Sequence, residues 1–251
     1  MASPTIGARS ILVADGWRKR SGDCYTRRLV PGVLGLLALR PVRGLPHQWR
    51  LEPYVGLVHE RVNGLAAALR GGAQESPYPQ DTIRAPLVRL LDGPEAREGD
   101  RWLVAAQAPG NNERVFREVA EAAREVGLPW LHKRTGLDAI AYELRDGNGP
   151  WRRTPYLTAA LWLQGEVDAA EAWLEEVTSQ FGRPGPEIPE DLRGLRATSL
   201  GTSAPPEGWP RQAFDAFAAR LRDGMARHPG GPPDDWHPPP GNSLASGPPR
   251  V

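Results

Sequence analysis

The sequence is poor in cysteine and lysine: Cys24 is its one cysteine, and Lys19 and Lys133 are its two lysines. One cysteine excludes an intramolecular disulfide and a zinc site of several cysteines, and such a residue is more often a small buried hydrophobic group than a catalytic thiol. The longest apolar stretch, residues 29–39, is interrupted by proline and glycine and is far shorter than the roughly 20 residues of a membrane span. We therefore expect a buried strand there and no membrane partner.

The N-terminus lacks the charged start and apolar run of a signal peptide, which predicts a cytoplasmic protein. Of the 251 residues, 28 are Gly and 27 are Pro, yet 40% are hydrophobic, which is enough for a core. Gly and Pro are concentrated in residues 182–210, interpreted as a connector, and in residues 229–251, interpreted as a disordered tail. This leaves 1–181 as a folded domain and 211–228 as a C-terminal helix that packs on it.

The first half of the domain has the pattern of an antiparallel sheet of about five strands, within residues 23–106. The predicted strands are 24–30, 33–42, 48–58, 82–91 and 101–106. The first three follow one another through short connections, which favours a meander. Pro53 cannot donate to a strand ladder, so it indicates an edge or a bulge.

The second half, residues 111–181, has apolar residues at helical spacing after a short helix at 63–69. Asn111 is expected to cap the first long helix, and Gly127 and Pro129 are expected to end it.

A helical hairpin follows. Thr154 and Pro155 are expected to be the N-cap and first residue of a helix over 155–164, and Asp168 is expected to start its partner. Strands first and helices after is the order of an α+β fold.

The charge is unevenly distributed along the chain, although the formal net charge is only +1. Residues 1–70 hold 11 basic and 4 acidic residues, whereas residues 71–251 hold 20 and 26. Such asymmetry can indicate an acidic partner for the first part, nucleic acid included. Alternatively, the two parts neutralise each other or the basic strand faces are simply solvated, since Arg18–Arg20 is the one clear basic run.

The common catalytic fingerprints are absent. The sequence has no phosphate-binding loop, dinucleotide-binding glycine pattern, nucleophile elbow or paired-histidine zinc motif. Its five histidines lack metal-ligand spacing. We therefore expect no cofactor and no metal site.

One candidate site follows the third strand, where His59, Glu60 and Arg61 come at its junction with a helix. Histidine titrates near neutrality, so His59 and Glu60 could form a general acid/base pair. Alternatively, Glu60 only interacts with the positive end of the helix dipole.

The second candidate contains Trp130, His132, Lys133 and Arg134, predicted to lie in a loop between two helices. Such aromatic and basic residues could bind nucleic acid or an acidic peptide. Alternatively, Trp130 anchors the loop to the core beside solvated charges.

Four segments in order resemble a group of uncharacterised bacterial proteins that share a domain of unknown function. They are the entry 16–20 into a meander, the stretch 55–62, the segment 127–131 and the hairpin 161–174. The resemblance covers roughly residues 5–181 and implies a small α+β fold of the accessory or immunity type, with no catalytic residues to carry over.

These observations favour a non-catalytic, macromolecule-binding module of the adaptor or immunity-like class, whose partner is another protein. One alternative is an enzyme of unrecognised type that uses His59 and Glu60. Another is nucleic-acid binding through the basic N-terminal part.

Overall fold

The computed structural model describes residues 7–20, 22–43, 47–71, 81–96, 101–105, 108–146, 150–181, 211–234 and 236. The chain divides into two compact units. Unit 1 takes Met1–Arg61 and Ser76–Ile140, and unit 2 takes Val62–Glu75 and Ala141–Val251. The predicted connector 182–210 lies outside the described residues.

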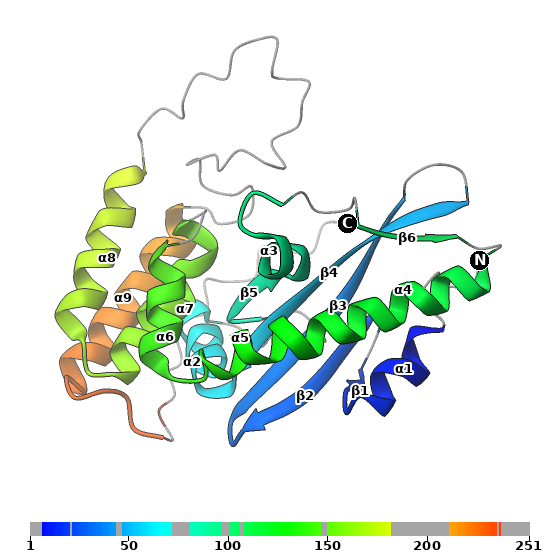
Figure 1. The fold of residues 1–251 in the computed structure, drawn as a ribbon. Helices are drawn as coiled ribbons and strands as arrows, with labels where there is room; N and C mark the ends of the chain where they lie inside the picture. Colours follow the sequence, from blue (N-terminus) through cyan, green and yellow to red (C-terminus); the bar gives the residue numbers. More distant parts are fainter. Residues whose placement is uncertain are drawn as a thin grey trace, which may run out of the picture. The chain divides into compact units, whose positions relative to one another are not determined.

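Unit 1 contains an antiparallel sheet of six strands. They are β1 (Arg18–Lys19), β2 (Cys24–Val30), β3 (Val33–Arg43), β4 (Gln48–His59), β5 (Ile83–Pro86) and β6 (Trp102–Ala105). The strand order is β1-β2-β3-β4-β5, and β6 also pairs with β4 (Figure 1). The α+β class, with the sheet in the N-terminal half and helices in the C-terminal half, is thus confirmed.

The meander β2-β3-β4 forms the centre of the sheet. The chain turns at Pro31 and Gly32, where Gly32 adopts φ +73°, a conformation that favours glycine. From there β3 and β4 pair without interruption, from Val33 opposite His59 to Arg43 opposite Trp49. Nearly continuous apolar residues along β3 therefore form a strand that is buried on both faces.

Two strands share the other side of β4. β5 pairs with Tyr54–Leu57 and β6 pairs with Gln48–Leu51, both antiparallel to β4. Pro53 lies between these two stretches. The backbone of Leu39, opposite Pro53, bonds toward β2, so the position where Pro53 lacks an N–H faces the gap between β5 and β6. The edge expected at Pro53 is thus a local one inside a central strand.

The predicted strand 82–91 is only partly a strand. β5 ends at Pro86, which has no N–H for the ladder, and the short helix α3 (Leu87–Asp92) follows. Leu87 and Val88 are buried. The apolar run was long enough for a strand, but burial on one side of a helix satisfies it equally well.

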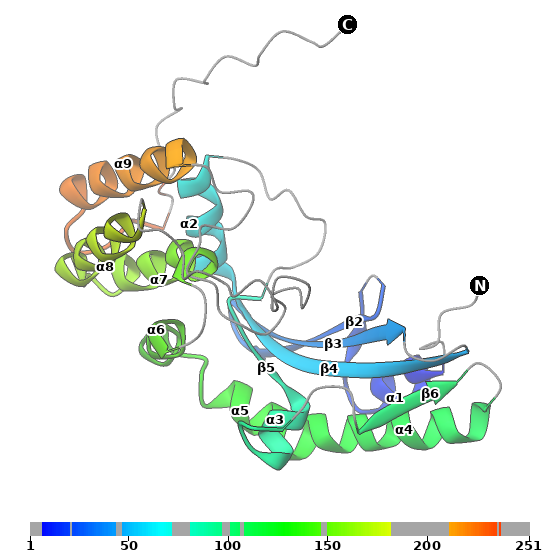
Figure 2. The ribbon, with the colours of Figure 1, turned by 90° about the horizontal axis from the view of Figure 1, so that it is seen from above.

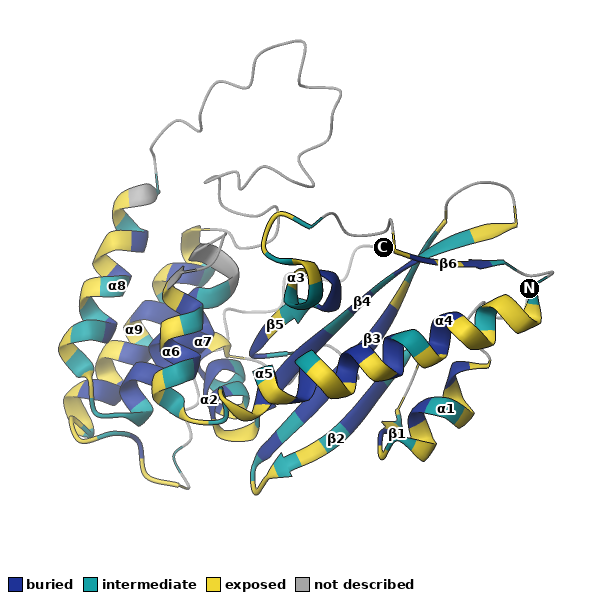
Figure 3. Ribbon diagram, viewed as in Figure 1, coloured by how far each residue is buried: buried dark blue, intermediate teal, exposed yellow. Residues whose placement is uncertain are grey.

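Helices cover one face of the sheet, as Figure 2 shows for α1, α3, α4 and α5. Two glycines allow close approach. A Cβ on Gly127 would lie 2.9 Å from Val55 Cγ1, and one on Gly35 would lie 3.1 Å from Leu131 Cδ1. Figure 3 shows alternating buried and exposed patches along α4, as expected of a helix with one face on a sheet.

The long helical segment differs from the prediction at both ends. The helix α4 (Pro109–Ala122) begins before Asn111, with Pro109 in its first turn, so Asn111 is not its N-cap. Gly127 and Pro129 do not end the segment. It continues through a π-helical turn, η1 (Ala123–Gly127), into α5 (Leu128–His132), because the wider π turn accommodates the proline ring.

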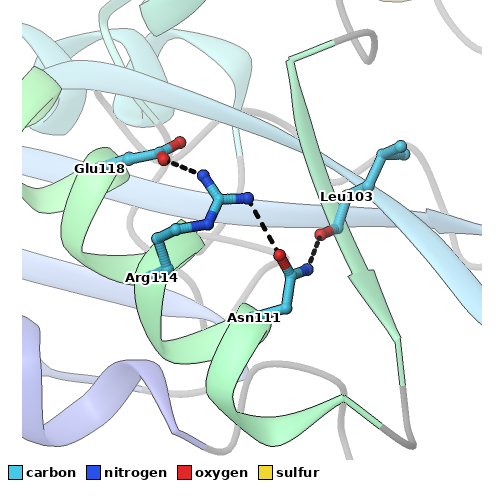
Figure 4. A network of polar contacts seen from close by, with 4 residues as sticks. All are labelled: Leu103, Asn111, Arg114 and Glu118. Atoms are coloured by element: carbon cyan, nitrogen blue, oxygen red, sulfur yellow. Dashed lines mark hydrogen bonds and ion pairs between the residues drawn. The ribbon is translucent and has the colours of Figure 1, made fainter.

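The asparagines at the start of α4 instead bond the free edge of β6, and Figure 4 shows the bonds of Asn111. The Asn112 amide accepts from the N–H of Ala105 at 2.9 Å and donates to its carbonyl at 2.7 Å. Asn111 donates to the carbonyl of Leu103 and accepts from Arg114, which also pairs with Glu118. These side chains take the place of a further strand.

Unit 2 is helical. It contains most of α2 (Glu60–Arg70), the end of α6 (Leu137–Asp146), the hairpin α7 (Pro150–Leu163) and α8 (Val167–Gln180), and α9 (Arg211–Arg227). α2 begins three residues before the predicted start and ends at Gly71, which has φ +81°. The expected hairpin is present, and α9 packs against α8.

Thr154 and Pro155 lie inside α7 and are not its N-terminal pair. Thr154 is buried, its carbonyl accepts from the Thr158 hydroxyl at 2.7 Å, and its own hydroxyl accepts from Trp173 Nε1 at 3.1 Å. These bonds tie α7 internally and to α8. Thr154 is therefore a packing residue inside α7, and the prediction that it caps the start of the helix is wrong.

Trp162 joins α7 to the end of the described chain. Its Nε1 donates to the His228 carbonyl at 2.9 Å, and Trp236 packs edge-on against its ring at 4.9 Å between centroids. The first residues of the tail predicted from residue 229 are therefore packed on α7, whereas residues 237–251 lie outside the described part of the chain.

Candidate functional site

His59, Glu60 and Arg61 lie where β4 runs into α2. The His59 N–H donates to Thr82 Oγ1 at 2.9 Å, and burial, reinforced by the nearby Arg61, lowers the pKa of His59. Glu60 and Arg61 are exposed. The two cavities described below are lined by other residues. The junction thus presents a half-buried histidine beside an exposed carboxylate. Neither residue lines either of the two cavities.

The Trp130 cluster is not in a loop. Trp130 and His132 belong to α5, and Lys133 and Arg134 form the turn after it, because the π turn lets the helix continue past Pro129. The Arg134 guanidinium lies 4.5 Å from the Trp130 ring centroid, and its Nη1 donates to the Trp130 carbonyl at 3.3 Å. One face of the indole is therefore covered from within the cluster, while His132 and Lys133 remain exposed.

A polar cluster that sequence reasoning missed lies on the sheet face opposite the helices. The strand register places Cys24, Ala38 and Tyr54 in one row, and Gly56 is next to this row. Asp81, just before β5, lies over Gly56, since a Cβ on that glycine would be 2.8 Å from Asp81 Cβ.

Arg84 joins this cluster through two contacts. Its Nε is 3.6 Å from Asp81 Oδ2, and its guanidinium carbon is 5.5 Å from the Tyr54 ring centroid. Part of the cluster could have been found from the sequence. Cys24 in β2 and Tyr54 in β4 both lie opposite Ala38 of β3, which follows once the meander register is known.

Burial dominates the electrostatics of the cluster. It raises the pKa of Asp81 even though Arg84 opposes the shift, and it raises the pKa of Tyr54 and of the Cys24 thiol, the latter also through Asp23. A thiol with a raised pKa is protonated at neutral pH and is a poor nucleophile. The cluster can therefore donate hydrogen bonds, but its thiol is not activated.

A groove of about 770 Å³ lies between α1 (Ala8–Ala14) and α4. Ile11 and the buried Phe116 line its apolar part. Charges at the groove form internal pairs, Arg124 with Asp15 at 3.4 Å and Arg117 with Glu113 at 2.7 Å.

A smaller cavity of about 380 Å³ lies between α8 and α9. Its basic residues are paired in the same way, Arg211 with Asp215 and Arg222 with Glu171. Each hollow keeps one acidic lining residue outside these pairs, Glu121 in the groove and Glu175 in the smaller cavity, and neither lining has an excess of basic residues.

An unbalanced charge is found at the outer side of β1 and β2. We call Arg18, Arg20 and Arg28 the basic edge. Arg18 is opposite Thr26, Arg28 is two residues further on the same face, and Arg20 Nε donates to Thr26 Oγ1 at 3.1 Å. All three arginines are exposed.

No residue in the described ranges forms an ion pair with the basic edge. The nearest acidic residues along the chain have other partners: Asp15 pairs with Arg124, and Asp23 pairs with Lys19 at 3.9 Å. The basic edge contains Arg18 and Arg20 of the basic run seen in the sequence, and it accounts for part of the positive charge of residues 1–70.

No family model matches the chain, and the comparisons with curated proteins and with solved structures return no match either. Within the described ranges, no group of three or more His, Cys, Asp or Glu residues could hold a metal ion. None of the described helices is both long and apolar enough to cross a membrane.

Proposed function

We propose that this protein is a non-catalytic binding module of the adaptor or immunity-like class, and that it contacts another protein through the basic edge. The observation that carries the proposal is the exposure of Arg18, Arg20 and Arg28 without a carboxylate partner in the described part of the chain. Elsewhere arginines such as Arg117 and Arg222 are paired. Guanidinium groups without a carboxylate partner, on and beside the β1–β2 strand pair, are available for carboxylates of a partner.

The electrostatics of the other candidates support binding rather than catalysis. Raised pKa values at Cys24 and Tyr54 do not favour a nucleophile, and Glu60 is exposed to solvent beside His59. A broad hydrolase and nuclease screen tests the enzyme alternative. Turnover by the purified protein that His59→Ala abolishes would contradict our proposal.

Binding is tested by fluorescence anisotropy of the full chain with a labelled oligoglutamate peptide at low and physiological salt. The double variant Arg18→Glu/Arg28→Glu should weaken binding about tenfold or more, because each exposed ion pair contributes up to about 1 kcal/mol and reversal adds repulsion.

Arg43→Glu is the matched control, because Arg43 is exposed and lies at the far end of β3. It should change the affinity less than twofold to threefold. The double variant changes the net charge by −4 and Arg43→Glu changes it by −2, so a control that loses half as much binding free energy as the double variant would mean that net charge alone governs binding. No binding at low salt would contradict the proposed function.

A further inference from the structure

The two outer edges of the sheet differ in whether their outward backbone groups are hydrogen-bonded. At β6 the amide of Asn112 bonds both backbone groups of Ala105, and Asn111 bonds the Leu103 carbonyl. At the other side, β1 pairs with β2 at Tyr25 and Thr26, and the Arg20 N–H donates to the Cys24 carbonyl at 3.0 Å, so this cover ends before Arg28. One edge is thus closed by side chains, whereas the end of the other is left without a neighbouring strand.

The backbone of Arg28 faces this free edge. The Leu39 N–H donates to the Asp23 carbonyl at 2.9 Å, which makes Cys24 and Ala38 a pair without mutual hydrogen bonds. The pattern alternates along β2, so Arg28 turns its N–H and its carbonyl away from β3. Within the described part of the chain neither group has a partner.

Two kinds of group therefore coincide at one place: the free N–H and carbonyl of Arg28, and the guanidinium groups of the basic edge. Alternate residues of an extended peptide repeat every 6.6 Å or so, which is also the spacing from Thr26 to Arg28 along β2. A strand with carboxylates at alternate positions could thus bond the backbone of Arg28 and pair with Arg18, Arg20 and Arg28 together.

We infer that the partner presents an extended acidic segment that adds as a short strand beside Arg28 of β2. This inference rests on the proposed function and specifies its partner and binding mode. The regular β2–β3 register is interrupted between Arg28 and Val30, so the free stretch is short. Its backbone supplies about two hydrogen bonds, and the arginines supply the charge selectivity.

A nucleic acid fits this edge less well. Single-stranded nucleic acids bind to basic surfaces that also expose aromatic rings for stacking. The aromatic residues of this part, Trp17 and Tyr25, are 1% and 0% exposed. Burial raises the pKa of Tyr25 to about 12, in keeping with a ring that serves the core.

A second copy of this chain is also disfavoured. Its own β2 would bring the same arginines against the basic edge, and like charges on neighbouring strands repel.

The experiment compares two labelled octapeptides of alternating Glu and Val. In one of them, the alternate backbone nitrogens that would face β2 are N-methylated. Both carry the same charge, but the methylated peptide cannot form the strand ladder. With the full chain the plain peptide should bind about tenfold more tightly, as expected when two backbone hydrogen bonds are lost. Arg18→Glu/Arg28→Glu should abolish this preference, and Arg43→Glu should retain it.

The outcomes separate the two proposals. Equal binding of both peptides would overturn strand addition while leaving anion binding by the basic edge intact. Failure of both peptides together with oligoglutamate would overturn the proposed function itself. Tighter binding of a single-stranded DNA of equal charge at physiological salt would overturn the choice of a protein partner.

Discussion

At the residue scale, Asp81 is a largely buried carboxyl whose surroundings disfavour its ionised form. Its carboxyl lies over Gly56, Arg84 is its one ionic partner within the described ranges, and burial raises its pKa. A carboxyl whose pKa is higher in the folded than in the unfolded state stabilises the fold below the unfolded pKa, and this stabilisation is lost as the pH rises through the folded pKa. At neutral pH the ionised carboxylate thus costs folding free energy.

We expect Asp81→Asn to raise the free energy of unfolding at pH 7 relative to the parent protein, because the neutral amide avoids the desolvation of a carboxylate. The difference should shrink as the pH is lowered toward the unfolded pKa of about 3.9. Urea unfolding at a series of pH values measures this. Glu121→Gln, at an exposed position of α4, is the control and should show no such trend. A destabilised Asp81→Asn protein at pH 7 would instead mean that the Arg84 ion pair outweighs burial.

At the element scale, the asparagines at the start of α4 join a helix to the sheet. Side-chain amides replace the backbone of a further strand, which natural sheets need in some form at an exposed edge. Asn112 makes both bonds to Ala105, whereas Asn111 bonds Leu103 at 3.2 Å and is exposed. The two neighbouring residues should therefore differ in their effect on stability.

Asn112→Ala should lower the free energy of unfolding by about 2 kcal/mol, because it leaves the N–H and carbonyl of half-buried Ala105 without their partners. Asn111→Ala should cost about 0.5 kcal/mol, since water can replace its bond. Chemical denaturation compares the two variants. Sedimentation should also detect more self-association in Asn112→Ala, and equal losses for both would contradict the capping role.

The elements that sequence reasoning predicted well are those with one dominant pattern. β2, β3 and β4 follow the expected ranges within about a residue, because β-branched residues and the Pro31-Gly32 turn act together. Segments with competing patterns were misassigned. Pro86, Pro129 and Pro155 sit at a strand end, after a π turn and inside a helix, and only tertiary packing decides among these roles.

The basic edge was not among the candidate sites predicted from the sequence, which were residues 59–61 and 130–134. The sequence showed Arg18–Arg20 only as the one clear basic run of a positively charged N-terminal part, and its grouping with Arg28 depends on which strand β1 pairs with. Asp81 was missed because its position over Gly56 follows from the pairing of β5 with β4, which no local pattern encodes.

At the scale of the whole molecule, a net charge of +1 conceals local differences. Most arginines in unit 2, such as Arg222, have a carboxylate or carbonyl partner, whereas the basic edge in unit 1 has no ionic partner in the described ranges. The proposed binding therefore depends on unit 1, while unit 2 has its own core around Trp162, Phe214 and Phe217.

Two glycine substitutions in unit 2 should have opposite effects. A Cβ at Gly224 would overlap the Trp162 ring, so Gly224→Ala should cost about 3 kcal/mol of unfolding free energy in unit 2. Gly64 in α2 is exposed with no atom within 4 Å of an added Cβ, so Gly64→Ala should stabilise by about 0.5–1 kcal/mol.

Thermal unfolding measures both glycine variants. Below its transition, Gly224→Ala should still bind oligoglutamate like the parent protein. Weaker binding by a folded Gly224→Ala protein would show that binding does not depend on unit 1 alone.

β5 and β6 run in the same direction along β4, with only Glu52 and Pro53 of β4 unmatched between them. They are two halves of one strand, interrupted by an excursion that contains α3. Each half has its own ladder of hydrogen bonds with β4. Pro53, opposite the interruption, has no N–H that needs a partner. We therefore expect that an insertion between Gly93 and Arg101 leaves the register of both halves unchanged.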